Sequence, residues 1–309
     1  MADILNQFFA CELSLQVGEQ LFATAARVDV WLLLEYRGAW GSEAFTESDL
    51  PQAVKRHLDG QLKAVPKSRL QLIKHDGSSS EKLLFYIAVA REIDPILYRF
   101  QLDSYEDLLT FDVPAILSDS TAYQHALSDK QLFLFCTNGR RDKCCTKFGL
   151  PVYQAAEKMV GDAAWQTTHL GGHRFAATAV FLPHGIVYGR ISPGDIAHLI
   201  EAYQQQRLDV GLYRGRSCYA ESAQAAEYFL RLETHASDLA QFRLIDSPKT
   251  DDSVYTVRFE SRSDGTLHII RLEQNLSRFQ VHKNSDSAEH APVLQFQLGS
   301  YEITNQPNL

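Results

Sequence analysis

The sequence lacks the charge clusters, long apolar runs and basic N-terminus that mark several large functional classes. It has no block of five or more like charges and a formal net charge of −8. Nucleic acid is therefore a poor partner, because binding it rewards clustered Lys and Arg. The longest apolar runs, such as Val28–Leu34, are far shorter than a membrane span. Asp3 stands where a secretory signal needs basic residues, so we expect no membrane partner and a cytoplasmic location.

Cysteine is also scarce. The five cysteines are Cys11, Cys136, Cys144, Cys145 and Cys218. An odd number with two adjacent members is a poor disulfide framework, and clustered cysteines in a cytosolic protein more often indicate metal or redox chemistry. The C-x-x-C signature of thioredoxin-type thiol oxidoreductases is absent. The sequence also offers no pair of carboxylates that spacing alone would place for glycoside cleavage.

Two stretches of the chain share one order of predicted elements: strand, loop, helix, strand, strand hairpin, helix. The first has strands at 28–36, 69–75, 82–90 and 96–102, a helix over 51–65 and a turn at 76–80. The second has strands at 132–136, 165–170, 175–182 and 186–191, a helix running to 160 through Pro151, and another from 192. This repetition favours an α+β protein with an internally duplicated thioredoxin-like unit, although short β-rich segments often look alike.

The duplication divides the chain into three parts. Residues 1–125 would form an N-terminal unit without ligands, since no Cys follows its first strand and it has no His pair. Residues 126–213 would form the second unit. Residues 214–309 would form a small α/β extension, with a helix over 220–233 and strands joined by the hairpin turn Ser263-Asp264-Gly265. Nothing in this extension suggests chemistry.

The second unit carries a metal-binding constellation. Cys136 ends an apolar strand, and Cys145 completes a C-x8-C spacing. His169 and His173 follow, separated by Leu-Gly-Gly. Each glycine costs about 1 kcal/mol in a helix relative to Ala, so this is not the helical His pair of a zinc protease, which also needs a Glu after its first His. The glycines instead let the backbone turn tightly beside a bulky group. Thiolates with imidazoles suit zinc or an iron–sulfur cluster.

The neighbouring residues fit such a site. Asp142 is a candidate cap for the helix that carries the cysteines, and a helix N-terminus favours the thiolate form. Cys144 is the alternative to Cys145 as a ligand. The residues that would place positive charge near an anionic site are Arg140, Arg141 and Arg174. Cys11 and Cys218 have no assigned chemistry and are expected to be structural.

The motifs Cys136-Thr137-Asn138-Gly139-Arg140-Arg141-Asp142-Lys143-Cys144-Cys145, His169-Leu170-Gly171-Gly172-His173-Arg174-Phe175-Ala176 and Val187-Tyr188-Gly189-Arg190 resemble the sucrase/ferredoxin-like family. The resemblance covers roughly residues 130–195. It implies a thioredoxin-like 2Fe–2S protein in which Cys136 and Cys145 hold one iron and His169 and His173 the other. Arg141 and Arg174 would lie close to the cluster. The "sucrase" part of the family's label does not imply that activity.

We therefore expect a one-electron carrier or redox sensor that serves a redox partner protein, rather than an enzyme with its own organic substrate. The main alternative is a zinc-binding structural or adaptor protein that uses the same four residues, because Cys2His2 is a common structural zinc set. Standard zinc motifs begin with C-x2–4-C, which the C-x8-C spacing does not match. A third hypothesis is a thiol oxidoreductase that uses Cys144 or Cys145. The absence of a C-x-x-C motif argues against it.

Overall fold

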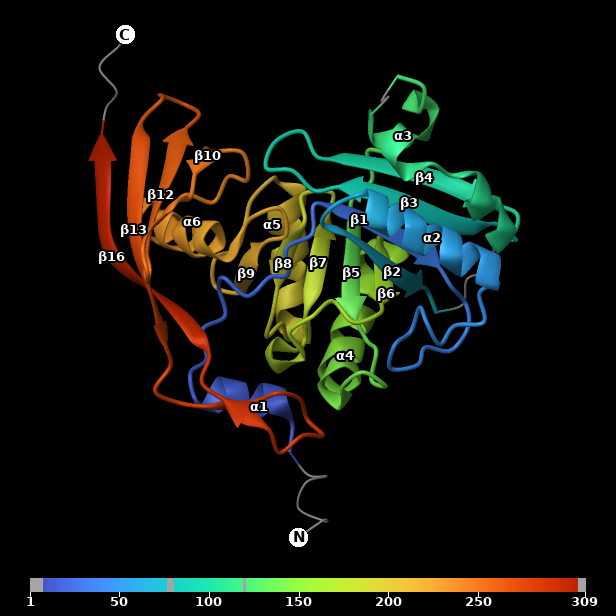
Figure 1. The fold of residues 1–309 in the computed structure, drawn as a ribbon, viewed down its shortest axis with the longest axis horizontal. Coiled ribbons are helices and arrows are strands. Elements are labelled where there is room, and N and C mark those ends of the chain that lie inside the picture. Colours follow the sequence, from blue (N-terminus) through green and yellow to red (C-terminus); the bar gives the residue numbers. More distant parts are fainter. Residues whose placement is uncertain (1–7, 77–80, 119–120, 305–309) are drawn as a thin grey trace.

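The computed structural model describes residues 8–76, 81–118 and 121–304. It is an α+β protein, as predicted, in which one curled mixed sheet carries most of the strands (Figure 1). Most of the predicted turn at 76–80 lies outside the described residues. Within the described ranges, no helix is both long enough and apolar enough to cross a bilayer.

The large sheet has nine strands. In spatial order they are β4 (Ile96–Leu102), β3 (Leu83–Val89), β1 (Val30–Glu35), β2 (Ser68–Lys74), β6 (Ala164–Thr167), β5 (Leu132–Cys136), β7 (Ala179–Leu182), β8 (Ile186–Tyr188) and β9 (Tyr213–Arg216). Every residue of β1 and of β5 is buried, which explains why both read as continuous apolar runs rather than alternating ones.

The two halves of this sheet repeat one topology. β1 and β2 are parallel and are joined through α2 (Gln52–Ala64), and β3 and β4 follow as antiparallel strands. β5 and β6 are likewise parallel and joined through α4 (Lys143–Val160), followed by antiparallel β7 and β8. The halves meet edge to edge where β2 pairs with β6.

Shorter helices complete each half. They are η1 (Tyr105–Thr110), α3 (Val113–Ser118) and η2 (Gln124–Ala126) after β4, η3 (Gly161–Ala163) after α4, η4 (His173–Phe175) after β6, and η5 (Pro193–Asp195) with α5 (Ile196–Gln204) after β8. A buried cluster spans the seam between the halves, with Trp31 and Leu33 from β1 beside Leu134 and Cys136 from β5. The first cysteine of the predicted site therefore lies where the two repeats share a core.

The last third of the chain adds a second sheet. Its strands are β10 (Phe242–Asp246), β11 (Lys249–Asp251), β12 (Val254–Ser261), β13 (Leu267–Leu276) and β16 (Leu294–Thr304). Helix α6 (Glu221–Thr234) lies between this sheet and β9 (Figure 1). Buried Glu227 on α6 binds buried Arg216 on β9 at 2.9 Å, so the extension is tied to the nine-stranded sheet by an internal ion pair.

The first described helix and a segment around residues 281–291 lie together near the start of α4. Helix α1 (Ala10–Gln16) packs against the tail segment β14 (Val281–His282), which pairs with β15 (His290–Ala291) (Figure 1). Helix α1 also packs against η4, the turn that contains His173. Helix α1 and the segment around β14 thus cover one side of the predicted site.

Candidate metal centre

The first donor, Cys136, is the last residue of β5 and is buried. Its backbone N–H donates to the Thr178 carbonyl at 3.0 Å, which continues the ladder between β5 and β7 up to this residue. A rigid central strand therefore positions its thiol, as the sequence predicted.

The second donor, Cys145, lies in the first turn of α4. Asp142 caps this helix, and its carboxylate accepts a hydrogen bond from the Cys144 N–H at 2.8 Å. The helix starts at Lys143, well before Pro151, and continues through that proline. It crosses the end of β5 at Gly149, where an added Cβ would lie 2.1 Å from the Cys136 carbonyl oxygen. This close approach brings the two cysteines together.

The third donor, His169, lies in the loop after β6. The predicted strand at 165–170 ends early, at Thr167, because the chain turns away through Gly171 and Gly172, whose φ values of +93° and +74° are left-handed. The Arg69 guanidinium holds this loop by donating to the carbonyls of His169 at 2.6 Å and Leu170 at 2.9 Å.

These three side chains converge. The His169 Nδ1 lies 3.8 Å from the Cys136 Sγ and 3.6 Å from the Cys145 Sγ, and the three donor atoms lie within 4.8 Å of one another. A metal–sulfur bond of about 2.3 Å and a metal–nitrogen bond of about 2.1 Å at a tetrahedral angle separate the two ligand atoms by about 3.6 Å. The protein atoms are therefore spaced as ligands that share a metal.

His173 lies beside this group, with its ring centroid 5.5 Å from that of His169. Its Nε2 is 2.7 Å from the Lys283 carbonyl oxygen and donates to it, which leaves the lone pair on Nδ1. The Nδ1 is buried and has no hydrogen-bond partner among the described residues. Burial lowers the pKa of His173 and favours the neutral ring. A histidine whose outer nitrogen is held by a carbonyl is prepared to bind a metal through the other nitrogen.

Comparison with known proteins places this site in a family. The sucrase/ferredoxin-like family model matches residues 21–215, which is more than half of the chain. The chain belongs to the sucrase/ferredoxin-like family. The match includes both repeats of the nine-stranded sheet, although only the second carries the converging Cys and His residues. No curated protein and no solved structure matches the chain.

In this family member the two site cysteines share a proton. The Cys145 thiol donates to the Cys136 sulfur, and this hydrogen bond, with a smaller effect from His169, holds the pKa of Cys136 well below its usual range. The same hydrogen bond, with burial, raises the pKa of Cys145. One thiolate is thus ready for a metal, and the second forms when the metal displaces the proton.

Cys144, the alternative ligand, is outside the group of three donors. Its Sγ lies 2.6 Å from the Cys11 Sγ and 3.2 Å from the Ser285 Oγ. Ser285 also donates its backbone N–H and its hydroxyl to the Asp142 carboxylate, at 2.9 and 2.8 Å. The tail of the chain therefore braces the cap of the helix that carries Cys145.

Both arginines predicted near the cluster bind carboxylates. Arg174 contacts Glu19 at 2.8 Å. Arg141 pairs with Glu43 and, together with His169 and Arg69, lines a cavity of about 190 Å³.

Sequence reasoning missed the two arginines that hold the histidine loop, Arg69 and Arg214. Arg214 is buried and donates to the Gly171 carbonyl at 3.0 Å, and burial lowers its pKa to about 9. Arg69 precedes His169 by 100 residues and Arg214 follows Gly171 by 43, so no local motif connects them. No local motif connects Lys283 with His173 or Ser285 with Asp142 either, so the sequence did not predict these two contacts.

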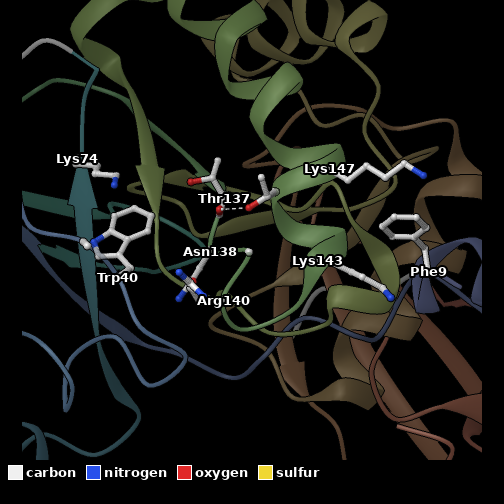
Figure 2. A pocket seen from close by; sticks show the side chains of 11 residues that line it. Phe9, Trp40, Lys74, Thr137, Asn138, Arg140, Lys143 and Lys147 are labelled. Carbon is white, nitrogen blue, oxygen red and sulfur yellow. Dashed lines mark hydrogen bonds between the residues drawn. The ribbon is translucent and has the colours of Figure 1, made fainter. Parts of the chain in front are cut away.

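A groove of about 680 Å³ runs beside the loop that joins Cys136 to Cys145. Figure 2 shows Trp40 and Lys74 on one side, Phe9, Lys143 and Lys147 on the other, and Thr137, Asn138 and Arg140 between them. The Thr146 hydroxyl closes the loop by donating to the Thr137 carbonyl at 2.9 Å. Four basic residues line the groove in a protein of net charge −8, although Lys143 and Lys147 pair with Asp286 and Glu12.

Proposed function

We propose that this protein is a 2Fe–2S protein for electron transfer or redox sensing, and that its two repeats are thioredoxin-like units of which only the second holds the cluster. The convergence of Cys136, Cys145 and His169 carries this proposal, together with the His173 Nδ1, which has no hydrogen-bond partner in the described part of the chain. Membership of a ferredoxin-like family supports the cluster over other metal groups.

In this proposal Cys136 and Cys145 hold one iron, and His169 and His173 hold the other. The cluster supplies reversible one-electron chemistry when bound. Two neutral imidazoles in place of two thiolates make the ligand set less anionic, which raises the reduction potential. The Lys283 carbonyl keeps the proton of His173 on Nε2. The residues act as ligands and tuners rather than as acid, base or nucleophile, and the electrons pass to a redox partner protein.

A second candidate is a structural zinc site with the same residues. The specific observation in its favour is the separation of 3.6–3.8 Å between His169 Nδ1 and the two sulfurs, which suits ligands of a single tetrahedral ion. A cluster that divides the cysteines and histidines between two irons requires the His169 ring to move away from the thiols. The four donors fit both groups chemically, so metal content distinguishes them.

The experiment is anaerobic purification from iron-replete cells, followed by iron, zinc and sulfide analysis and an absorption spectrum. We expect about two irons and about two sulfides per chain and the visible absorption of a cluster. Cys136→Ser and Cys145→Ser should lose the metal, whereas Cys144→Ser and Cys218→Ser, as matched controls, should retain it. Stoichiometric zinc without iron would overturn the cluster and support the structural zinc site.

A further inference from the structure

A second pair of cysteines meets next to the proposed metal centre, outside its ligand set. Cys11 is on helix α1 and Cys144 is on helix α4, 133 positions later, and their sulfurs are 2.6 Å apart. The Cys11 backbone N–H also points at the Cys144 sulfur, at 3.4 Å. Both side chains are almost fully buried, with 5% and 0% exposed. Two thiols from distant parts of the chain are thus held in contact by the fold.

We propose that Cys11 and Cys144 form a reversible disulfide when a peroxide oxidises the protein. A disulfide needs a sulfur separation of about 2.05 Å, so bond formation requires the two sulfurs to approach by only about 0.5 Å more. The bond consumes no metal ligand, because Cys136 and Cys145 form a separate group with His169.

The reaction balances with hydrogen peroxide as the two-electron oxidant. One of the two sulfurs attacks a peroxide oxygen, the O–O bond breaks, and a sulfenic acid and water form. The other sulfur then attacks the sulfenic sulfur, the S–O bond breaks, and a second water leaves. The two thiols lose two electrons and two hydrogens in total. A dithiol reductant reverses the reaction by thiol–disulfide exchange.

The disulfide would restrain the two segments that pack over the metal site, helix α1 and the tail around Ser285. Helix α1 packs against the turn that contains His173. Just beyond α1, the Glu19 carboxylate binds Arg174 at 2.8 Å and the Glu19 carbonyl accepts from Arg190 at 2.7 Å. On the other side, Cys144 contacts Ser285 of the tail. A covalent link at this point would join the N-terminal helix to the helix that carries Cys145, so oxidation would restrain both parts around the site.

The test is disulfide mapping of the purified full-length protein. The protein is exposed to stoichiometric hydrogen peroxide, its free thiols are alkylated, and it is digested with trypsin without reduction. We expect a species that joins the peptide of residues 1–27 to the peptide of residues 144–147, with one alkyl group on Cys145. Its mass should be two hydrogens less than the sum of the two peptides and that group, and Cys218 should be alkylated. Dithiothreitol should release both peptides.

Cysteine variants assign the bond. Cys11→Ser and Cys144→Ser should each abolish the linked species, whereas Cys218→Ser, the matched control, should keep it. Cys145→Ser should also keep it, because that residue belongs to the metal group. Absence of the link in the native protein, or its survival in Cys144→Ser, would overturn the proposal. Circular dichroism of each variant verifies folding, and iron analysis reports separately on the proposed cluster, so the two proposals fail independently.

Discussion

At the scale of single residues, the two histidines of the H-x3-H motif have different surroundings. His169 directs its Nδ1 at two thiols, and its carbonyl is held by Arg69. His173 has its Nε2 tied to the Lys283 carbonyl and leaves Nδ1 for a ligand. Outer partners of this kind orient a ligand and choose its tautomer. The role of each histidine therefore depends on residues that the motif does not contain.

A third histidine, His184, is expected to make the free energy of unfolding depend on pH. Its Nδ1 accepts from the buried Tyr203 hydroxyl at 2.9 Å, and burial, with a smaller effect from Arg216, lowers its pKa to about 4. The unfolded chain has a His pKa of about 6.5, so between these values the unfolded state binds more protons. The free energy of unfolding should therefore fall as pH drops from about 6.5 to 4. Above pH 6.5, titration of His184 should not change the free energy of unfolding.

Urea denaturation at pH 7 and at pH 4.5 measures this effect. His184→Asn should reduce the difference between the urea concentrations at half-unfolding at pH 7 and pH 4.5, because Asn can accept a hydrogen bond but does not titrate in this range. His125→Asn is the control, because that side chain is exposed on the surface. An equal loss of stability at pH 4.5 in the native protein and in His184→Asn would contradict the assignment.

At the scale of elements, the contact between α4 and β5 depends on Gly149. A Cβ at this position would lie 2.1 Å from the Cys136 backbone oxygen, which cannot move without shifting the strand. We expect Gly149→Ala to destabilise the protein by about 1–3 kcal/mol, the usual cost of overpacking a well-packed site, and to weaken metal retention by displacing Cys136 from Cys145. Urea denaturation and metal analysis measure the two effects.

Helix α2 of the first repeat provides the matched control. Its Gly60 has no atom within 4 Å of an added Cβ, so Gly60→Ala should stabilise the protein by up to about 1 kcal/mol through helix propensity alone. If Gly149→Ala were equally stabilising, the close contact would have no energetic significance.

The difference between these two glycines shows which features of the fold and site local sequence patterns can predict and which they cannot. The strand ending at Cys136, the capping of α4 by Asp142 and the tight turn at Gly171 and Gly172 follow from local patterns, and the structure contains all three. The position of Pro151 in α4 did not, because a proline can either start or kink a helix, and here one helix runs from Lys143 through that proline. Gly149 looks the same in sequence whether it faces solvent or another backbone. Contacts such as Arg69 with His169, or Cys11 with Cys144, depend on packing between distant segments and leave no local signal.

At the scale of the whole molecule, the distribution of charge is uneven. The chain carries 38 acidic and 30 basic residues, yet the groove beside the Cys136–Cys145 loop is lined by Lys74, Arg140, Lys143 and Lys147, of which the last two pair with Asp286 and Glu12. A local positive field of this kind attracts anions and speeds their association, and salt weakens it. If the proposed cluster exchanges electrons through this face, its reaction rates should depend on the charge of the partner.

Oxidation of the reduced protein by small metal complexes tests this dependence. Lys74→Glu/Arg140→Glu should slow oxidation by an anionic complex such as ferricyanide and speed oxidation by a cationic cobalt complex, and both effects should diminish in high salt because screening shortens the range of the field. Lys158→Glu/Arg262→Glu is the control with the same change in net charge. Lys158 lies about 20 Å from Cys145 along α4, and Arg262 is an exposed residue in the turn between β12 and β13. If both double variants changed the rates equally, only the overall charge would matter and electrons would not pass preferentially through the groove face.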